Sequence, residues 1–216
     1  MDIYDRLYAA NGPQHWWPGD SAFEIIAGAI LTQSAAWGNV EQALDNLKAA
    51  GALCPEGIAA MTEGKLAELI RPSGYFNAKA RKLKAFVSVL SSRFEGDLQL
   101  LLSLPTAELR TLLLATYGIG PETADSILLY AAGRPVFVVD AYTRRMFSRL
   151  GLGPEVKTYD AWQTLFSESL PVDAAMFNEY HALIVRHGKQ VCRKRPLCHA
   201  CPLSEICATG MAAVVA

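Results

Sequence analysis

Apolar residues recur at helical spacing along most of the chain and predict an all-α fold. Within each segment, apolar side chains stand three or four positions apart, the spacing of one buried helix face. Residues 136–139 favour a strand by composition, but without evident partner strands we interpret them as an extended link. The predicted helices cover residues 1–11, 23–31, 40–53, 58–70, 73–94, 98–102, 107–116, 123–132, 142–150, 159–170 and 173–187.

Length and charge narrow the classes of protein that the pattern allows. The 216 residues carry a formal net charge of −1, so a nucleic-acid surface would have to be local rather than global. No apolar run approaches the roughly 18 residues of a membrane span. The first residues lack the basic and apolar regions of a secretory signal, and we expect an intracellular protein.

A glycine-rich turn separates two of the predicted helices. Gly118 and Gly120 flank Ile119, and Pro121 follows at the start of the next apolar pattern. Glycine relaxes the backbone where two helices turn sharply, and proline fits a first helical turn. Taken alone, this motif is typical of an ordinary helix–turn–helix corner.

The residues that follow this turn extend the motif. Gly118-Ile-Gly-Pro-Glu-Thr-Ala-Asp125 leads to Val-Val-Asp140 and then to Arg144 and Arg145. This order resembles the helix-hairpin-helix plus Gly/Pro-Asp signature of the endonuclease III superfamily of DNA glycosylases. The resemblance implies that Gly118, Gly120, Glu122 and Thr123 contact the DNA backbone and that Asp140 is the catalytic carboxylate. Asp125 competes for that role, but we interpret it as a surface or capping group.

Two further segments resemble the same family. Gln33 follows an apolar helix in Leu31-Thr-Gln, and in the family this glutamine lies beside the opened DNA strand. A helix cap or turn hydrogen bond is the alternative for Gln33. The segment from Gly74 to Lys79-Ala80 opens a basic turn, where Lys79 is expected, like Arg144, to contact DNA. A solvated helix face is the alternative for this charge run.

Four of the five cysteines lie near the C-terminal end with the spacing C-x5-C-x2-C-x5-C. Four thiolates in one loop suit either an all-cysteine zinc site or an iron–sulfur cluster. The run resembles the [4Fe-4S] loop of endonuclease III, with a first gap one residue shorter, and the resemblance favours iron–sulfur over zinc. The predicted ligands are Cys192, Cys198, Cys201 and Cys207.

Several aromatic residues are candidates for a pocket that holds a flipped base. Trp16, Trp17 and Pro18 form a turn-rich loop, and Trp37 follows the Gln33 segment. Stacking on a flat base is the functional interpretation, and a hydrophobic plug under a loop is the alternative for the tandem tryptophans. Together with Gln33, these residues resemble the endonuclease III-like 3-methyladenine DNA glycosylases. Alkylated purines carry positive charge, which indole rings attract.

The residue at position 122 indicates whether the protein would cut the DNA strand as well as remove the base. Family members that also cut the strand carry a lysine at this hairpin position, and that lysine forms a Schiff base with the sugar. A carboxylate cannot form an imine, so the resemblance implies base excision without efficient strand cleavage. The alternatives are an endonuclease III-type glycosylase/lyase for oxidised or mismatched pyrimidines, and a non-catalytic iron–sulfur DNA-binding module.

The resemblance also implies a domain arrangement and partners. A central helical barrel would span residues 23–133, and residues 1–22 plus 134–216 would form a second helical domain that includes the iron–sulfur loop, 192–207. Damaged double-stranded DNA would bind in the cleft between them. We expect a monomer associated with the nucleoid rather than with a membrane.

Overall fold

The computed structural model describes residues 1–215, and within them helices are joined by turns and extended links without any β-strand. The predicted all-α fold class is therefore confirmed. Two compact units divide the chain, one made of residues 18–134 and the other of residues 1–17 with the segment from 135 onward. Among the described helices, none is both long and apolar enough to cross a membrane.

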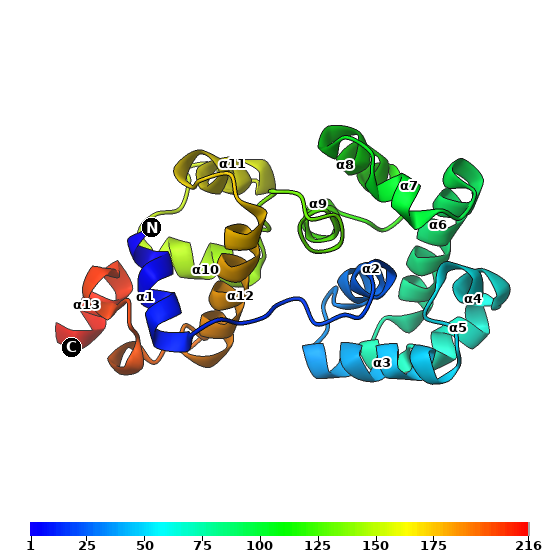
Figure 1. Ribbon diagram of the computed structural model, residues 1–216. Helices are drawn as coiled ribbons and strands as arrows, with labels where there is room; N and C mark the ends of the chain where they lie inside the picture. The colour runs from blue at the N-terminus through cyan, green and yellow to red at the C-terminus, as the bar shows by residue number, and fades with distance from the viewer. Residues whose placement is uncertain (216) are drawn as a thin grey trace. The chain divides into compact units, whose positions relative to one another are not determined.

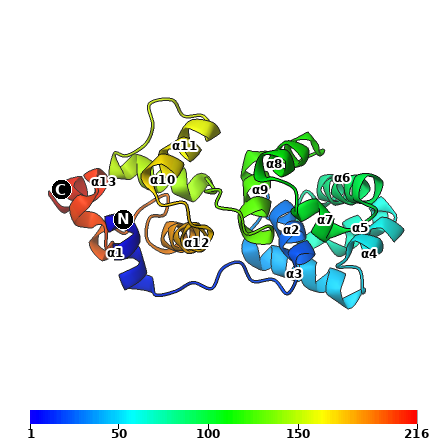
Figure 2. The same ribbon diagram turned by 45° about the horizontal axis from the view of Figure 1, so that its top comes forward.

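The unit of residues 18–134 is built around α2, most of whose residues are buried. Figure 1 shows α2 between α9 and α3. The one charged residue of α2, Glu24, pairs with Lys48 Nζ at 2.7 Å. The long helix α6 packs against α5, α4 and α2, and Figure 2 shows α4 and α5 beside it. The helices are α2 (Ala22–Leu31), α3 (Trp37–Ala49), α4 (Pro55–Ala60), α5 (Glu63–Leu69), the 3-10 helix η1 (Arg71–Ser73), α6 (Phe76–Phe94), α7 (Leu98–Leu102), α8 (Thr106–Ala115), α9 (Pro121–Ser126) and the π-helical turn η2 (Ile127–Ala131).

The other unit has an aromatic core. Phe137 stacks on Phe166 with ring centroids 4.1 Å apart, and the edges of Phe177 and Tyr180 pack against it. Helices α10 and α12 pack closely, and α1 lies against α12. The helices are α1 (Asp2–Asn11), α10 (Ala141–Leu150), α11 (Tyr159–Ser169), α12 (Ala174–Gln190), the 3-10 helices η3 (Cys198–Ala200) and η4 (Ser204–Ile206), and α13 (Ala208–Val215).

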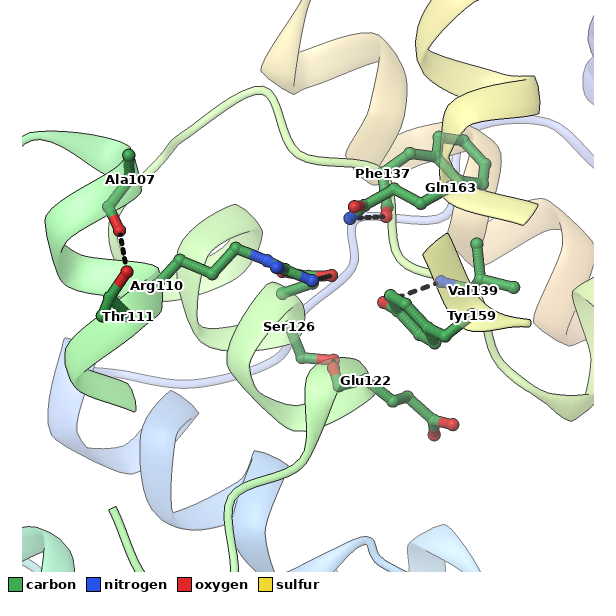
Figure 3. A network of polar contacts seen from close by, with 10 residues as sticks. Ala107, Arg110, Thr111, Glu122, Ser126, Phe137, Val139, Tyr159 and Gln163 are labelled. Carbon is green, nitrogen blue, oxygen red and sulfur yellow. Dashed lines mark hydrogen bonds and ion pairs between the residues drawn. The ribbon is translucent and has the colours of Figure 1, made fainter. Parts of the chain in front are cut away.

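Residues 133–140 have no helix or strand, and they include the extended link predicted over residues 136–139. Phe137, Val138 and Val139 are buried along it, which explains their strand-like composition without a sheet. Gln163 Nε2 donates to Phe137 O at 3.3 Å, and the Val139 amide donates to Tyr159 Oη at 3.5 Å (Figure 3). These contacts fix the residue at the end of the link, Asp140.

Three predicted helices differ most in extent from the observed ones. The helix predicted over residues 40–53 is α3, which begins at Trp37 and ends at Ala49. Residues 58–70 form two short helices rather than one, because Thr62 accepts a hydrogen bond from the Lys65 amide and starts α5 anew. The helix predicted over residues 123–132 begins earlier, at Pro121, and changes after Ser126 into the π-helical turn η2. Both breaks leave the buried face intact, which is why the apolar pattern did not reveal them.

Candidate active site and DNA interface

The turn between α8 and α9 depends on Gly118. Its φ of +79° is in the left-handed region, and a Cβ there would collide with the side chain of Lys82 from α6. Glycine therefore suits the backbone conformation and leaves room for the Lys82 side chain. Gly120 has an ordinary φ of −92°, so the second glycine of the motif is not needed for conformation.

Gln33 joins the end of α2 to this hairpin. Its Nε2 donates to Gly118 O at 3.1 Å and to Thr123 Oγ1 at 2.9 Å. Its Oε1 accepts a hydrogen bond from Lys82 Nζ. Both amide hydrogens are thus directed at hairpin residues 85 and 90 positions away, so the alternative of a local helix cap or turn bond is wrong. The place of Gln33 in the base pocket stays a prediction.

Lys79 is not at the surface, and its predicted contact with DNA is wrong. The side chain is 1% exposed, and its Nζ donates to Leu31 O at 2.8 Å and to Ser73 O at 2.6 Å. Those carbonyls end α2 and η1, and the ammonium supplies the donors they lack. Burial and the nearby charge of Lys82 lower the pKa of Lys79 to about 8.

The two acidic residues of α9 have different surroundings. Glu122 is exposed in the first turn, and Figure 3 shows its side chain extending away from the helix while its carbonyl accepts a 2.7 Å hydrogen bond from Ser126 Oγ. Asp125 is fully buried and paired with Arg110 of α8 at 2.7 and 3.2 Å. The interpretation of Asp125 as a surface or capping group is therefore wrong, because it holds the two hairpin helices together.

Asp140 caps α10. Its Oδ1 accepts hydrogen bonds from the Thr143 amide at 2.7 Å and from Thr143 Oγ1 at 2.9 Å. Its Oδ2 lies 3.8 Å from His181 Nε2 of α12, and the Asp140 side chain is 13% exposed. Burial lowers the pKa of His181 more than the Asp140 charge raises it, so the imidazole is neutral at pH 7. The carboxylate is thus fixed through one oxygen.

One arginine of α10 stacks on an aromatic ring, and two others form hydrogen bonds with the segment that leads into the cysteine loop. Arg144 stacks over the ring of Tyr159, with its guanidinium carbon 5.7 Å from the centroid. Arg145 donates to Gly188 O at 2.8 Å and to Cys192 O at 2.9 Å. Arg149 donates to Arg193 O at 2.6 Å and to Cys192 Sγ at 3.2 Å. Helix α10, which Asp140 caps, is therefore bonded to the cysteine loop near its C-terminal end.

The aromatic candidates are divided between the two units. Trp16 and Trp17 have ring centroids 5.3 Å apart, and Lys189 Nζ lies 6.0 Å from the centroid of Trp16. In the other unit, Pro18 and Trp37 line one hollow together with acidic side chains and Lys48. The predicted base pocket takes residues from both units and stays a prediction.

The four C-terminal cysteines line one small, largely apolar cavity with Arg149 and Leu197. Cys192 is buried and the other three are partly exposed. The fifth cysteine, Cys54, lies elsewhere and caps α4 by accepting from the Gly57 amide at 3.3 Å. Four thiol groups that line one small cavity fit an iron–sulfur cluster or a zinc ion by their chemistry. Among the described residues, no three such ligands converge tightly enough to hold a single ion.

Comparison with known families identifies this arrangement. The family described as "HhH-GPD superfamily base excision DNA repair protein" matches residues 27–172, which include the hairpin and Asp140. The chain belongs to this superfamily. It is a DNA glycosylase of the endonuclease III-like group, as the sequence predicted.

Relatives cover nearly the whole chain. It is 47% identical over 206 residues, 95% of this chain and 94% of the relative, to the Methanocaldococcus jannaschii protein named "Putative DNA repair glycosylase MJ1434". It is 31% identical over 193 residues to endonuclease III of Sulfolobus acidocaldarius, covering 87% and 82% of the two chains. It also resembles the structure of H. pylori 3-methyladenine DNA glycosylase (MagIII) bound to 1,N6-ethenoadenine, with a TM-score of 0.77, 31% identity and coverage of 88% and 96%.

In this glycosylase, several residues of the site escaped sequence reasoning. The backbone contact of Thr143 could have been found, because an aspartate just before a helix accepts from the amide two or three residues later. His181 and Arg110 gave no local signal, since their partners lie 41 and 15 residues away. Lys82 belongs to the basic turn that includes Lys79, but its partner Gln33 lies 49 residues away and was not foreseen. His199, which lies within the cysteine loop, is exposed.

Proposed function

We propose that this protein is a monofunctional DNA glycosylase that hydrolyses the N-glycosidic bond of alkylated purines such as 3-methyladenine. Its substrate is double-stranded DNA from which the damaged base is flipped. The observation that carries the monofunctional assignment is Glu122, which is exposed in the first turn of α9, at the hairpin position where the resemblance places the Schiff-base lysine of strand-cutting enzymes.

Asp140 is proposed as the catalytic carboxylate. Cleavage of the glycosidic bond builds positive charge at C1′ of the sugar, which a fixed negative charge stabilises. Thr143 binds Oδ1 with two hydrogen bonds, so Oδ2 is the oxygen available to face the sugar or to take a proton from water. The neutral His181 beside Oδ2 adds no opposing positive charge at this oxygen.

We expect no strand cleavage because Glu122 has a carboxylate where strand-cutting enzymes have an amine. β-Elimination through an imine requires an unprotonated amine next to C1′, and a carboxylate cannot supply it. Replacement of the base by water would leave an intact abasic strand, which breaks only in alkali. Hydrolysis without a covalent intermediate therefore suits this hairpin.

The substrate class rests on the tryptophans and on one relative. An indole attracts a cation by about 0.5–2 kcal/mol, and Trp16 already has the Lys189 ammonium over its ring. A positively charged alkylpurine offers the same interaction. The 31% identity with a 3-methyladenine DNA glycosylase over 88% of this chain supports this class.

The cysteine loop is proposed to hold a [4Fe-4S] cluster. Cys192, Cys198, Cys201 and Cys207 would be its ligands, because they line one cavity. When bound, the cluster would add folding free energy to the loop. Arg145 and Arg149 join this loop to α10 by hydrogen bonds, so the loop would help to hold the helix that Asp140 caps.

The test uses purified protein and duplex DNA that contains methylated purines. Released bases are identified by chromatography, and strand breaks are followed on a gel with and without alkali. The expected result is release of 3-methyladenine with breaks only after alkali. Failure to release any alkylpurine, together with nicking of an oxidised-pyrimidine duplex without alkali, would replace the proposal by an endonuclease III-type glycosylase/lyase. Binding without release from either duplex would indicate a non-catalytic module.

A further inference from the structure

Lys82, rather than Lys79, is the lysine of α6 that reaches the hairpin. Its methylene carbons lie against Gly118 so closely that a Cβ on that residue would collide with them. Its ammonium donates a hydrogen bond to Gln33 Oε1, and the side chain is only partly buried. Lys79, one helical turn earlier, is buried and directed at two backbone carbonyls.

The contacts of Lys82 leave its positive charge available. Its acceptor is a neutral amide rather than a carboxylate, and an ammonium has three donors, of which this bond uses one. Gln33 in turn is fixed by Gly118 O and Thr123 Oγ1, so the ammonium has a defined position. An uncompensated, positioned cation beside the turn suits an anionic ligand.

The charge of Lys82 is electrostatically unfavourable beside Lys79, and a residue that only packed over Gly118 would not need this charge. Two lysines one turn apart on α6 repel each other, and the charge of Lys82 contributes to the lowered pKa of Lys79. A glutamine or methionine could pack over Gly118 without this repulsion. The charge is therefore the property of Lys82 that needs an explanation.

We propose that Lys82 is a DNA-binding residue whose ammonium neutralises a backbone phosphate at the hairpin, with Gln33 holding it in place. This inference rests on the proposed function only in taking duplex DNA as the partner. It is independent of which base is removed and of whether the strand is cut.

The experiment measures the dissociation constant of the full-length protein for undamaged duplex DNA between 50 and 200 mM salt. One neutralised phosphate contributes about 0.9 to the slope of log K against log salt. We expect Lys82→Met to lower the magnitude of that slope by about 0.9. The wild type should therefore bind DNA more tightly than the variant at 50 mM salt, and this advantage should decrease about three- to fourfold by 200 mM salt. Lys82→Arg should restore the slope.

Lys84→Met is the matched control, because it removes the same charge from the same helix. Lys84 donates to Ala59 O and Met61 O at the end of α4, so its loss should leave the slope unchanged. If Lys82→Met weakens binding equally at every salt concentration, Lys82 is only a brace for Gln33 and the proposal is wrong. A wild-type protein without salt-dependent DNA binding would overturn the proposed function as well, whereas an inactive protein with the expected slopes would overturn only the substrate assignment.

Discussion

The aspartates at 125 and 140 should respond in opposite ways to the same substitution. Asp125→Asn removes the charge that pairs with Arg110, whose side chain is 27% exposed while that of Asp125 is fully buried. Leaving one partner of a buried pair uncompensated costs about 3–5 kcal/mol. Since Arg110 can partly rehydrate and the asparagine oxygen still accepts one hydrogen bond, we expect a loss of about 2–3 kcal/mol in the free energy of unfolding.

Asp140→Asn should leave stability nearly unchanged and remove activity. Asparagine caps a helix about as well as aspartate, so its oxygen can still accept from the Thr143 amide. The free energy of unfolding should change by less than about 1 kcal/mol. Without the carboxylate, base release in single turnover should fall about 10²- to 10⁴-fold.

The two variants are compared by urea unfolding and by single-turnover base release per folded molecule. DNA affinity is measured for both, and neither variant should lose more than a few-fold, since neither substitution removes a proposed phosphate contact. An Asp125→Asn protein of normal stability that no longer releases base would refute the assignment of the two carboxylates. A fully active Asp140→Asn protein would refute it equally.

Other predictions test separate parts of the structure. In the wild type, the free energy of unfolding should rise by up to about 3 kcal/mol as pH increases from about 8 to about 10.5. The reason is that Lys79 loses its proton at a lower pH in the folded protein than in the unfolded chain. Urea titrations at several pH values measure this rise, and Lys79→Met should reduce it. Glu122→Lys should form an imine with abasic DNA that borohydride reduces to a stable covalent complex. If this variant gives no covalent complex, Glu122 does not lie at the position of the Schiff-base lysine. Cys198→Ser should lower iron and sulfide content below the about four of each per chain expected for wild type, whereas a wild-type protein that contains zinc alone would exclude the cluster.

The all-α fold and the hairpin could be predicted from the sequence because their signals are local. Helical spacing, the Gly118–Gly120 turn and the proline that starts α9 act over a few residues, where propensity and backbone freedom decide the conformation. Asp140 was predicted only as the catalytic carboxylate, which stays a prediction, and its role as the cap of α10 was not foreseen. The order of these segments was enough to indicate the family.

Tertiary structure alone decided what the charged and amide side chains do. Lys79 is buried because its ammonium meets carbonyls that end two other elements, Leu31 O and Ser73 O. The amide of Gln33 meets a hairpin carbonyl 85 residues away, and Asp125 meets Arg110 across the hairpin. A sequence pattern records that such residues are polar, but whether a polar group faces water, a carbonyl or an opposite charge depends on which distant segments pack against it.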